Sequence, residues 1–152
     1  MKTIEGILNP IKDMAKASFG AKLLRGVNNW ILDNDSSLID NSLSNFTYHE
    51  PYNDILIQLS QVIYTDSIRL VTWGEMDYEF YISVSTDNKN WNVIYKYKDE
   101  DNKTSEHKIT LPKLQPVLFI RMYGENVDEN EDIDDTFRIV KFECPAILSN
   151  IA

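Results

Sequence analysis

The residue types that most often perform catalysis are sparse in this chain. It has two histidines, His49 and His107, and one cysteine, Cys144. Neither histidine has a Cys or His partner at a metal-binding spacing, and both stand among polar residues that are typical of turns. Cys144 lacks the basic or histidine neighbour that activates a thiol, so we expect it to be buried and inert. The G-x-S-x-G, H-E-x-x-H and phosphate-binding glycine patterns are also absent from the sequence. The sequence therefore predicts a protein that is not an enzyme.

Carboxylates are numerous, and they concentrate between Glu125 and Asp135, where seven of eleven residues are acidic. The pattern that begins at Asp128 is similar to an EF-hand calcium loop. However, Ile133 occupies the position that needs glycine, and Ile139 that of the bidentate glutamate. We therefore expect a solvated acidic loop that steers a basic partner by long-range attraction.

Period-two alternation of apolar residues, which begins at about residue 23, predicts β-strands. The predicted strands cover residues 55–59, 68–72, 80–85, 91–97, 108–111, 117–123 and 137–142. The run Asp87-Asn88-Lys89-Asn90 predicts a tight hairpin turn, because these residues tolerate left-handed backbone. Many short strands with little helix are typical of an antiparallel sandwich or barrel. We expect its core to contain Trp91, Ile57, Leu70, Ile82 and Ile120.

The first 22 residues have a different pattern. Apolar residues recur at spacings of three and four, which is typical of one helical stripe: Ile4, Ile7, Leu8, Ile11 and Met14. We expect a short helical or extended arm that docks on its own domain or on a neighbour. An organelle-targeting peptide is the alternative, and Glu5 and Asp13 argue against it because such peptides are poor in acids.

Several stretches, in order along the chain, resemble the motifs of one family: residues 26–48, 55–59 with 68–70, 81–91, 117–122 and 137–145. The family is the discoidin domain, also called the coagulation-factor C-type domain, of the galactose-binding-like superfamily. The last stretch, which ends Lys141-Phe142-Glu143-Cys144-Pro145, is closest to the intracellular version at the C-terminus of BTB-domain adaptor proteins. The sequence departs from the family pattern at Asn41, where glycine is usual, and at Tyr48, where tryptophan is usual.

The resemblance covers about residues 18–146 and implies an all-β, antiparallel jelly-roll β-sandwich. We expect an N-terminal arm over residues 1–22, the discoidin-like sandwich over 23–146 and a C-terminal tail over 147–152. The resemblance also implies that Arg121 pairs with a carboxylate, which here could be Asp40 or Glu143. Carbohydrate-binding relatives often hold a structural calcium ion in this part of the fold, and Asp40 and Glu143 are the possible ligands. We expect no other cofactor.

Composition limits the partners. A net charge of −9 and a pI near 4.6 disfavour nucleic acid and anionic lipid surfaces, because both carry negative charge. No apolar run approaches the ~18 residues that a membrane-spanning helix needs. One cysteine forms no internal disulfide, and no cleavable signal precedes the domain, so we expect an intracellular, cytoplasmic protein. A location in a cytoskeletal or ciliary assembly, or in an organelle, is an alternative that the sequence leaves open.

Two functions follow from the resemblance. The first is a non-catalytic protein-interaction module or structural subunit of a larger assembly. The second is a lectin-like carbohydrate-binding domain, in which Trp30, Tyr48, Tyr52 and Trp73 could stack on sugars. An exposed aromatic cleft with polar groups would favour the second, and a flat apolar patch the first.

We expect the partner to bind at the loop end of the sandwich and along the N-terminal arm, because loops tolerate variation while sheets carry the core. The loop-end residues are Asn28, Asn29, Trp30, Trp73, Glu75 and Met76, and the arm residues are Ile4, Ile7, Leu8 and Ile11. The bland alternative is that Trp30 or Trp73 only plugs the end of the sandwich.

Overall fold

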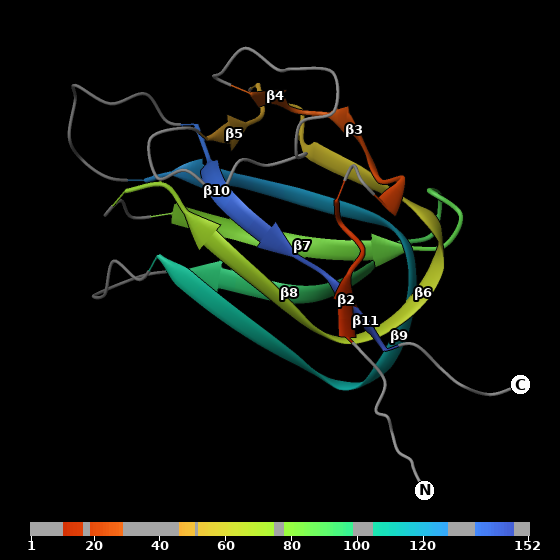
Figure 1. The fold of residues 1–152 in the computed structure, drawn as a ribbon. Coiled ribbons are helices and arrows are strands. Elements are labelled where there is room, and N and C mark those ends of the chain that lie inside the picture. The colour runs from red at the N-terminus through yellow and green to blue at the C-terminus, as the bar shows by residue number, and fades with distance from the viewer. Residues whose placement is uncertain are drawn as a thin grey trace, which may run out of the picture.

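The computed structural model describes residues 11–16, 19–28, 46–50, 52–74, 78–98, 105–127 and 136–147, and this part of the chain is nearly all antiparallel β-structure (Figure 1). Its strands are β2 (Ile11–Asp13), β3 (Lys22–Arg25), β4 (Val27–Asn28), β5 (Thr47–Tyr48), β6 (Ile55–Thr72), β7 (Tyr78–Ser85), β8 (Asn92–Lys98), β9 (Glu106–Asn126), β10 (Arg138–Glu143) and β11 (Pro145–Ile147). The predicted all-β sandwich is confirmed. No helix among these residues is long and apolar enough to cross a membrane.

Two long strands connect the layers of the sandwich. Strands β6 and β9 contain 18 and 21 residues, and both bend sharply along their length (Figure 1). Their pairing register shifts between Gln58 and Ile63 and again between Thr65 and Ser67. The start of β6 and the end of β9 form one layer with β3, β7 and β8, whereas their other halves form the second layer with β10 and β5.

The sequence predicted four short strands where the structure has β6 and β9. The apolar alternation lapses at Ser60, Gln61 and Val62, whose side chains are exposed at the bend. A strand can bend without ending, because its backbone keeps partners in either layer while its side chains leave the core.

The core lies between the layers. Four of the five predicted core residues are fully or almost fully buried: Ile57, Leu70, Ile82 and Ile120. The prediction for Trp91 is wrong, because its ring is half-buried and lies against Arg121.

A β-bulge explains the position of Trp91. Ile82 lies opposite Tyr95, but the next residue, Ser83, lies opposite Val93, so strand β8 contains one extra residue. A one-residue slip moves every following side chain to the other face of a sheet. The side chain of Trp91 therefore lies on the outer face of the sheet rather than on the core face.

The histidines also differ from the expectation of polar turns, because both are buried, with 4% of each exposed. His107 lies within β9, and its ring packs edge-on against Phe80 and Tyr97 at centroid distances of 5.0 and 4.4 Å. Tyr95 adds a hydrogen bond between its hydroxyl and Nδ1 at 3.2 Å. His107 is thus part of an aromatic cluster between the layers.

The two ends of the described chain are paired. Strand β2 pairs antiparallel with β11, so the backbone is extended at Ile11–Asp13 and the helical alternative is wrong there. The Asp13 carboxylate accepts hydrogen bonds from the backbone N–H groups of Ala15 and Cys144, at 3.0 and 2.9 Å. Met14 and Ala15 are buried in the core. The arm residues Ile4, Ile7 and Leu8 lie outside the described residues.

Candidate binding site

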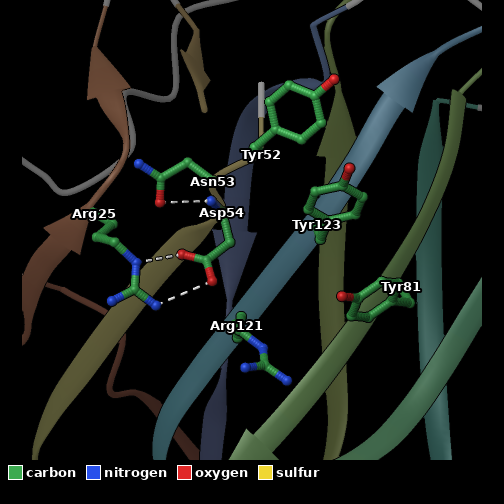
Figure 2. Close-up of a pocket in the computed structure, with 7 residues that line it drawn as sticks. All are labelled: Arg25, Tyr52, Asn53, Asp54, Tyr81, Arg121 and Tyr123. Carbon is green, nitrogen blue, oxygen red and sulfur yellow. Dashed lines mark hydrogen bonds and ion pairs between the residues drawn. The ribbon is translucent and has the colours of Figure 1, made fainter. Parts of the chain in front are cut away.

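The outer face of the first layer carries an open hollow of about 540 Å³ (Figure 2). Its lining residues are Arg25, Tyr52, Asn53, Asp54, Tyr81, Arg121 and Tyr123. Arg25 comes from β3, Tyr81 from β7, and Arg121 and Tyr123 from β9, whereas the other three residues directly precede β6. Strands β3, β6, β9 and β7 lie side by side in the sheet. The hollow therefore collects side chains that are far apart in the sequence.

Strand alternation directs these side chains outward. Ile120 and Met122 of β9 and Ile82 of β7 face the core, so Arg121, Tyr123 and Tyr81 face the opposite way. Tyr81 lies directly opposite Tyr123 in the ladder, and Ser83 lies directly opposite Arg121.

Tyr123 is fixed by its neighbours. The His49 ring stacks on it at a centroid distance of 5.1 Å and an interplanar angle of 22°, and Tyr81 lies 5.6 Å away with a tilt of 30°. His49 Nε2 accepts the backbone N–H of Gly124 at 3.1 Å, and Nδ1 lies 3.0 Å from the carbonyl oxygen of Glu50. With Nε2 as the acceptor, the tautomer with its proton on Nδ1 donates to the Glu50 carbonyl.

One of the two arginines in the hollow is paired. Arg25 binds Asp54 in a bidentate ion pair, with Nε–Oδ1 at 2.6 Å and Nη2–Oδ2 at 3.0 Å. This hydrogen bonding raises the pKa of Arg25. Asn53 accepts the backbone N–H of Asp54 at 3.0 Å, and next to it Tyr52, at φ 64°, is 99% exposed. The rim of the hollow thus carries a neutralised ion pair and a free aromatic ring.

Arg121 is the other arginine. Its guanidinium carbon lies 4.1 Å from the centroid of the Trp91 ring, in a cation–π contact. Its Nε is buried and has no hydrogen-bond partner among the described residues, and the same holds for the buried Oγ of Ser83. The structure therefore leaves a cation in the floor of the hollow without a carboxylate from any described residue.

Trp73, the predicted loop-end residue whose side chain the structure describes, does not line this hollow. Trp73 is half-buried beside Phe46, at a centroid distance of 5.2 Å, and the guanidinium of Arg138 lies 5.0 Å from its ring. The backbone of Asn28, in β4, pairs with Thr47 of β5. The others, Asn29, Trp30, Glu75 and Met76, lie outside the described residues, as does most of the acidic loop. A partner role for this end of the sandwich stays a prediction.

Sequence reasoning named Tyr52 and Arg121 but missed Tyr81 and Tyr123 and the hollow that brings these residues together, although a signal for it exists. The outward positions of the alternating strands carry Tyr81, Arg121 and Tyr123 where small polar residues are more typical. Alternation identifies such positions within each strand, but only the register brings Tyr81 opposite Tyr123.

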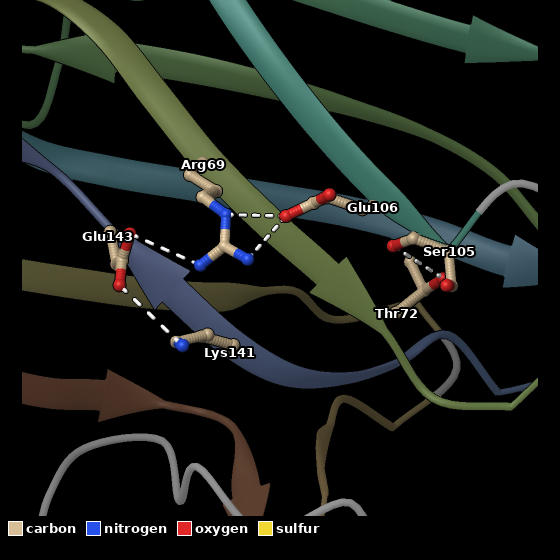
Figure 3. A network of polar contacts seen from close by, with 6 residues as sticks. All are labelled: Arg69, Thr72, Ser105, Glu106, Lys141 and Glu143. Carbon is tan, nitrogen blue, oxygen red and sulfur yellow. Dashed lines mark hydrogen bonds and ion pairs between the residues drawn. The ribbon is translucent and has the colours of Figure 1, made fainter.

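The predicted calcium ligand Glu143 is engaged elsewhere. Its Oε1 accepts from Arg69 Nη1 at 3.4 Å, and Lys141 Nζ lies 3.9 Å from Oε2 (Figure 3). Arg69 also donates to Glu106, with Nε–Oε2 at 2.7 Å. The implied pairing of Arg121 with Glu143 is therefore wrong.

Asp40, the other predicted ligand and the other proposed partner of Arg121, lies outside the described residues. Within the described ranges, no group of three or more His, Cys, Asp or Glu side chains could hold a metal ion. Calcium binding by Asp40 and Glu143 stays a prediction.

No protein-family model matches the chain. Among curated proteins it is similar to BTB/POZ domain-containing protein 9 of Mus musculus, with 31% identity over 152 residues that cover 96% of this chain and 24% of that protein. The Homo sapiens protein of the same name is 31% identical over 147 residues, which cover 93% of the chain and 23% of that protein. The chain thus spans about a quarter of the length of these relatives.

Solved structures share the fold at low sequence identity. A family 89 glycoside hydrolase from Clostridium perfringens in complex with PUGNAc superimposes with a TM-score of 0.64 at 20% identity, over 89% of this chain and 15% of that one. The family 32 carbohydrate-binding module of EndoD from Streptococcus pneumoniae gives 0.55 at 12%, over 88% and 98%. The corresponding module of AlyQ, in complex with 4,5-unsaturated mannuronic acid, gives 0.56 at 14%, over 81% and 95%. The chain therefore has the galactose-binding-like β-sandwich fold of these carbohydrate-binding modules.

Proposed function

We propose that this domain is a non-catalytic protein-interaction module of a larger assembly, and that it contacts its partner through the outer-face hollow. The observation that carries the proposal is the combination of an exposed Tyr52 on the rim with an Arg121 that has no carboxylate partner among the described residues. Tyrosine and arginine are enriched among the residues that dominate binding energy at protein interfaces.

The aromatic rings of the hollow support a protein partner over a sugar. A carbohydrate site offers the open face of a ring, but Tyr123 is flanked by His49 and Tyr81. The guanidinium of Arg121 occupies one face of Trp91. Such rings stiffen the floor of a site, and they leave edges and hydroxyl groups for a partner to contact.

Chemistry in the hollow is disfavoured by its charges. Acid–base catalysis needs a free carboxylate or a similar group in reach of a substrate. Among the described lining residues the carboxylate is Asp54, and both of its oxygens accept from Arg25. We also expect the domain to work in a reducing compartment. Cys144 is the only cysteine in the sequence, so no internal disulfide can stabilise the fold.

Carbohydrate binding is the second candidate. The structural neighbours with this fold are named as carbohydrate-binding modules, and one is in complex with an acidic sugar. Tyr52 has a free ring next to the polar groups of Asn53 and Asp54. A single free ring beside polar groups is the arrangement that a sugar could use.

The experiment compares variants in capture of the native partner and on a glycan array. We expect Tyr52→Ala to fold normally and to lose the captured partner, with no glycan signal in either protein. The matched control is Tyr64→Ala, which removes another exposed tyrosine that does not line the hollow. Two further variants, Trp30→Ala and deletion of residues 1–10, test the loop end and the arm.

The deletion must end before Ile11, because a longer one removes β2 and then the buried Met14 and Ala15. Loss of the partner only in Trp30→Ala or in the deletion would move the interface to the loop end or to the arm. A glycan signal that disappears in Tyr52→Ala would replace the proposal with the carbohydrate candidate.

A further inference from the structure

The charges of the described residues that line the hollow do not balance. Two arginines and one aspartate are among these residues, and both oxygens of Asp54 accept from Arg25. Arg121 makes neither a hydrogen bond nor an ion pair with any described residue, although the chain carries a net charge of −9. An arginine that pairs with no described carboxylate, in so acidic a protein, offers local positive charge to an anion.

The surroundings of Arg121 hold its guanidinium in place. Trp91 covers one face of the group at 4.1 Å, and the neighbouring strands place Leu56 and Ser83 directly opposite in the two ladders. Leu56 is 1% exposed and Ser83 is completely buried. A planar cation that is fixed in this way loses little conformational freedom when it binds a ligand.

One nitrogen of this guanidinium and one hydroxyl oxygen on the neighbouring strand lack partners among the described residues. Arg121 Nε and Ser83 Oγ are both buried and make no hydrogen bond within the described part of the chain. Buried polar groups are nearly always hydrogen-bonded, and the exceptions tend to mark functional positions. Figure 2 shows Arg121 in the floor between the Arg25–Asp54 pair and Tyr81, whose hydroxyl end is turned toward it.

We propose that the hollow binds a carboxylate group of a partner peptide, which Arg121 holds through its guanidinium. The inference rests on the proposed function and names the chemistry of the partner. Arginine presents N–H donors in a planar fork that matches the two oxygens of a carboxylate. The hydroxyl of Tyr81 supplies a further donor from the neighbouring strand.

Charge and ring packing select this ligand from other anions. Phosphate groups carry close to two negative charges and are typically held by several arginines, whereas the hollow offers one unpaired arginine. An acidic sugar needs a free ring face, and the Tyr123 ring already packs against His49 and Tyr81, which leaves Tyr52 on the rim for stacking. A single carboxylate, from a Glu or Asp side chain or from a peptide C-terminus, has the matching charge.

The test uses short peptides and nuclear magnetic resonance of the whole chain. One peptide is capped at both ends and contains a single glutamate, the second has a free C-terminus and no acidic side chain, and the third replaces the glutamate with glutamine. We expect saturable shifts at the Arg121 side chain and the Ser83 amide with one or both carboxylate peptides and none with the third. The two carboxylate peptides distinguish the source of the group.

Substitutions then assign the effect. We expect Arg121→Gln to weaken carboxylate binding at least ~10-fold and Arg121→Lys to weaken it less, because lysine keeps the charge but not the fork. The control is Arg69→Gln, which removes a paired arginine from the other layer. Amide spectra of each variant show whether it is folded. If Arg121→Gln does not fold, Ser83→Ala serves as the second variant.

The outcomes separate this inference from the proposed function. Equal binding by the glutamate and glutamine peptides, or normal binding by folded Arg121→Gln, overturns the carboxylate site. If Tyr52→Ala still loses the partner in that case, the interaction function stands without it. Saturable shifts with methyl glucuronide or a phosphoserine peptide, but with neither carboxylate peptide, also overturn the inference, and the sugar result overturns the protein-interaction function with it.

Discussion

Cys144 lies between β10 and β11 and is completely buried. Burial, with the nearby Asp13 carboxylate, raises the pKa of its thiol to about 12. The thiol is therefore protonated across the physiological range. The prediction that Cys144 is buried is confirmed, and its inertness stays a prediction. Its place beside Asp13 gives it a packing role at the junction of the two ends.

We predict that the native protein does not react with Ellman's reagent at pH 8, because a protonated and buried thiol is a poor nucleophile. The same protein in 6 M guanidinium chloride should react with one equivalent. Absorbance at 412 nm follows both reactions, and rapid labelling of the native protein would contradict the prediction. Reducing agent should leave the melting temperature unchanged.

The β7–β8 hairpin is the element whose local chemistry is clearest. Asn88 adopts φ 60°, as its residue type predicts, and Asp87 Oδ1 accepts the backbone N–H groups of Lys89 and Asn90 at 2.9 and 2.8 Å. Ser85 Oγ adds a bond to the same carboxylate at 3.0 Å. These donors lower the pKa of Asp87 well below its usual range.

The sign of the pH dependence follows from that lowered pKa. The carboxylate stabilises the fold at pH values above its unfolded pKa of about 3.9, and the stabilisation is lost as the pH falls toward the lower folded value. We predict that Asp87→Asn lowers the melting temperature at pH 7 and that the difference from wild type shrinks between about pH 5 and pH 2. Thermal unfolding across this range measures it, with Glu79→Gln as the control. A constant difference would show that Asp87 acts through shape and not through charge.

At the scale of the whole molecule, the β2–β11 pair joins the two ends of the described chain. Asp13 bonds to Cys144, 131 residues later, at 2.9 Å, and Met14 donates to the Cys144 carbonyl at 3.0 Å. The buried Met14 and Ala15 make this segment part of the sandwich core. The ends therefore contribute to the stability of the domain as a whole.

We predict that Asp13→Ala destabilises the domain by about 1–3 kcal/mol, because two backbone N–H groups lose their acceptor. Asp13→Asn should cost less, since its side-chain oxygen can still accept. Urea unfolding measures both, and the exposed Lys16→Ala is the control. An Asp13→Ala variant as stable as wild type would mean that water replaces the carboxylate at no cost.

The sequence by itself determined the properties that depend on neighbouring residues. Alternation located the strands and the core residues Ile57, Leu70, Ile82 and Ile120, and residue type located the Asn88 turn. Each of these is a local preference, since a strand's faces and a turn's backbone angles follow from a few adjacent residues.

Tertiary structure decided whatever depends on pairing between distant segments. The bulge that turned Trp91 outward, the extension at Ile11 and the hollow around Arg121 all arise from strand pairing. A one-residue change of register moves a side chain from the core to the surface, and alternation within one strand is the same in either case. The free energy of strand pairing depends on residues that lie far apart in the chain. Which side chains meet at the site is therefore determined only in the folded sheet.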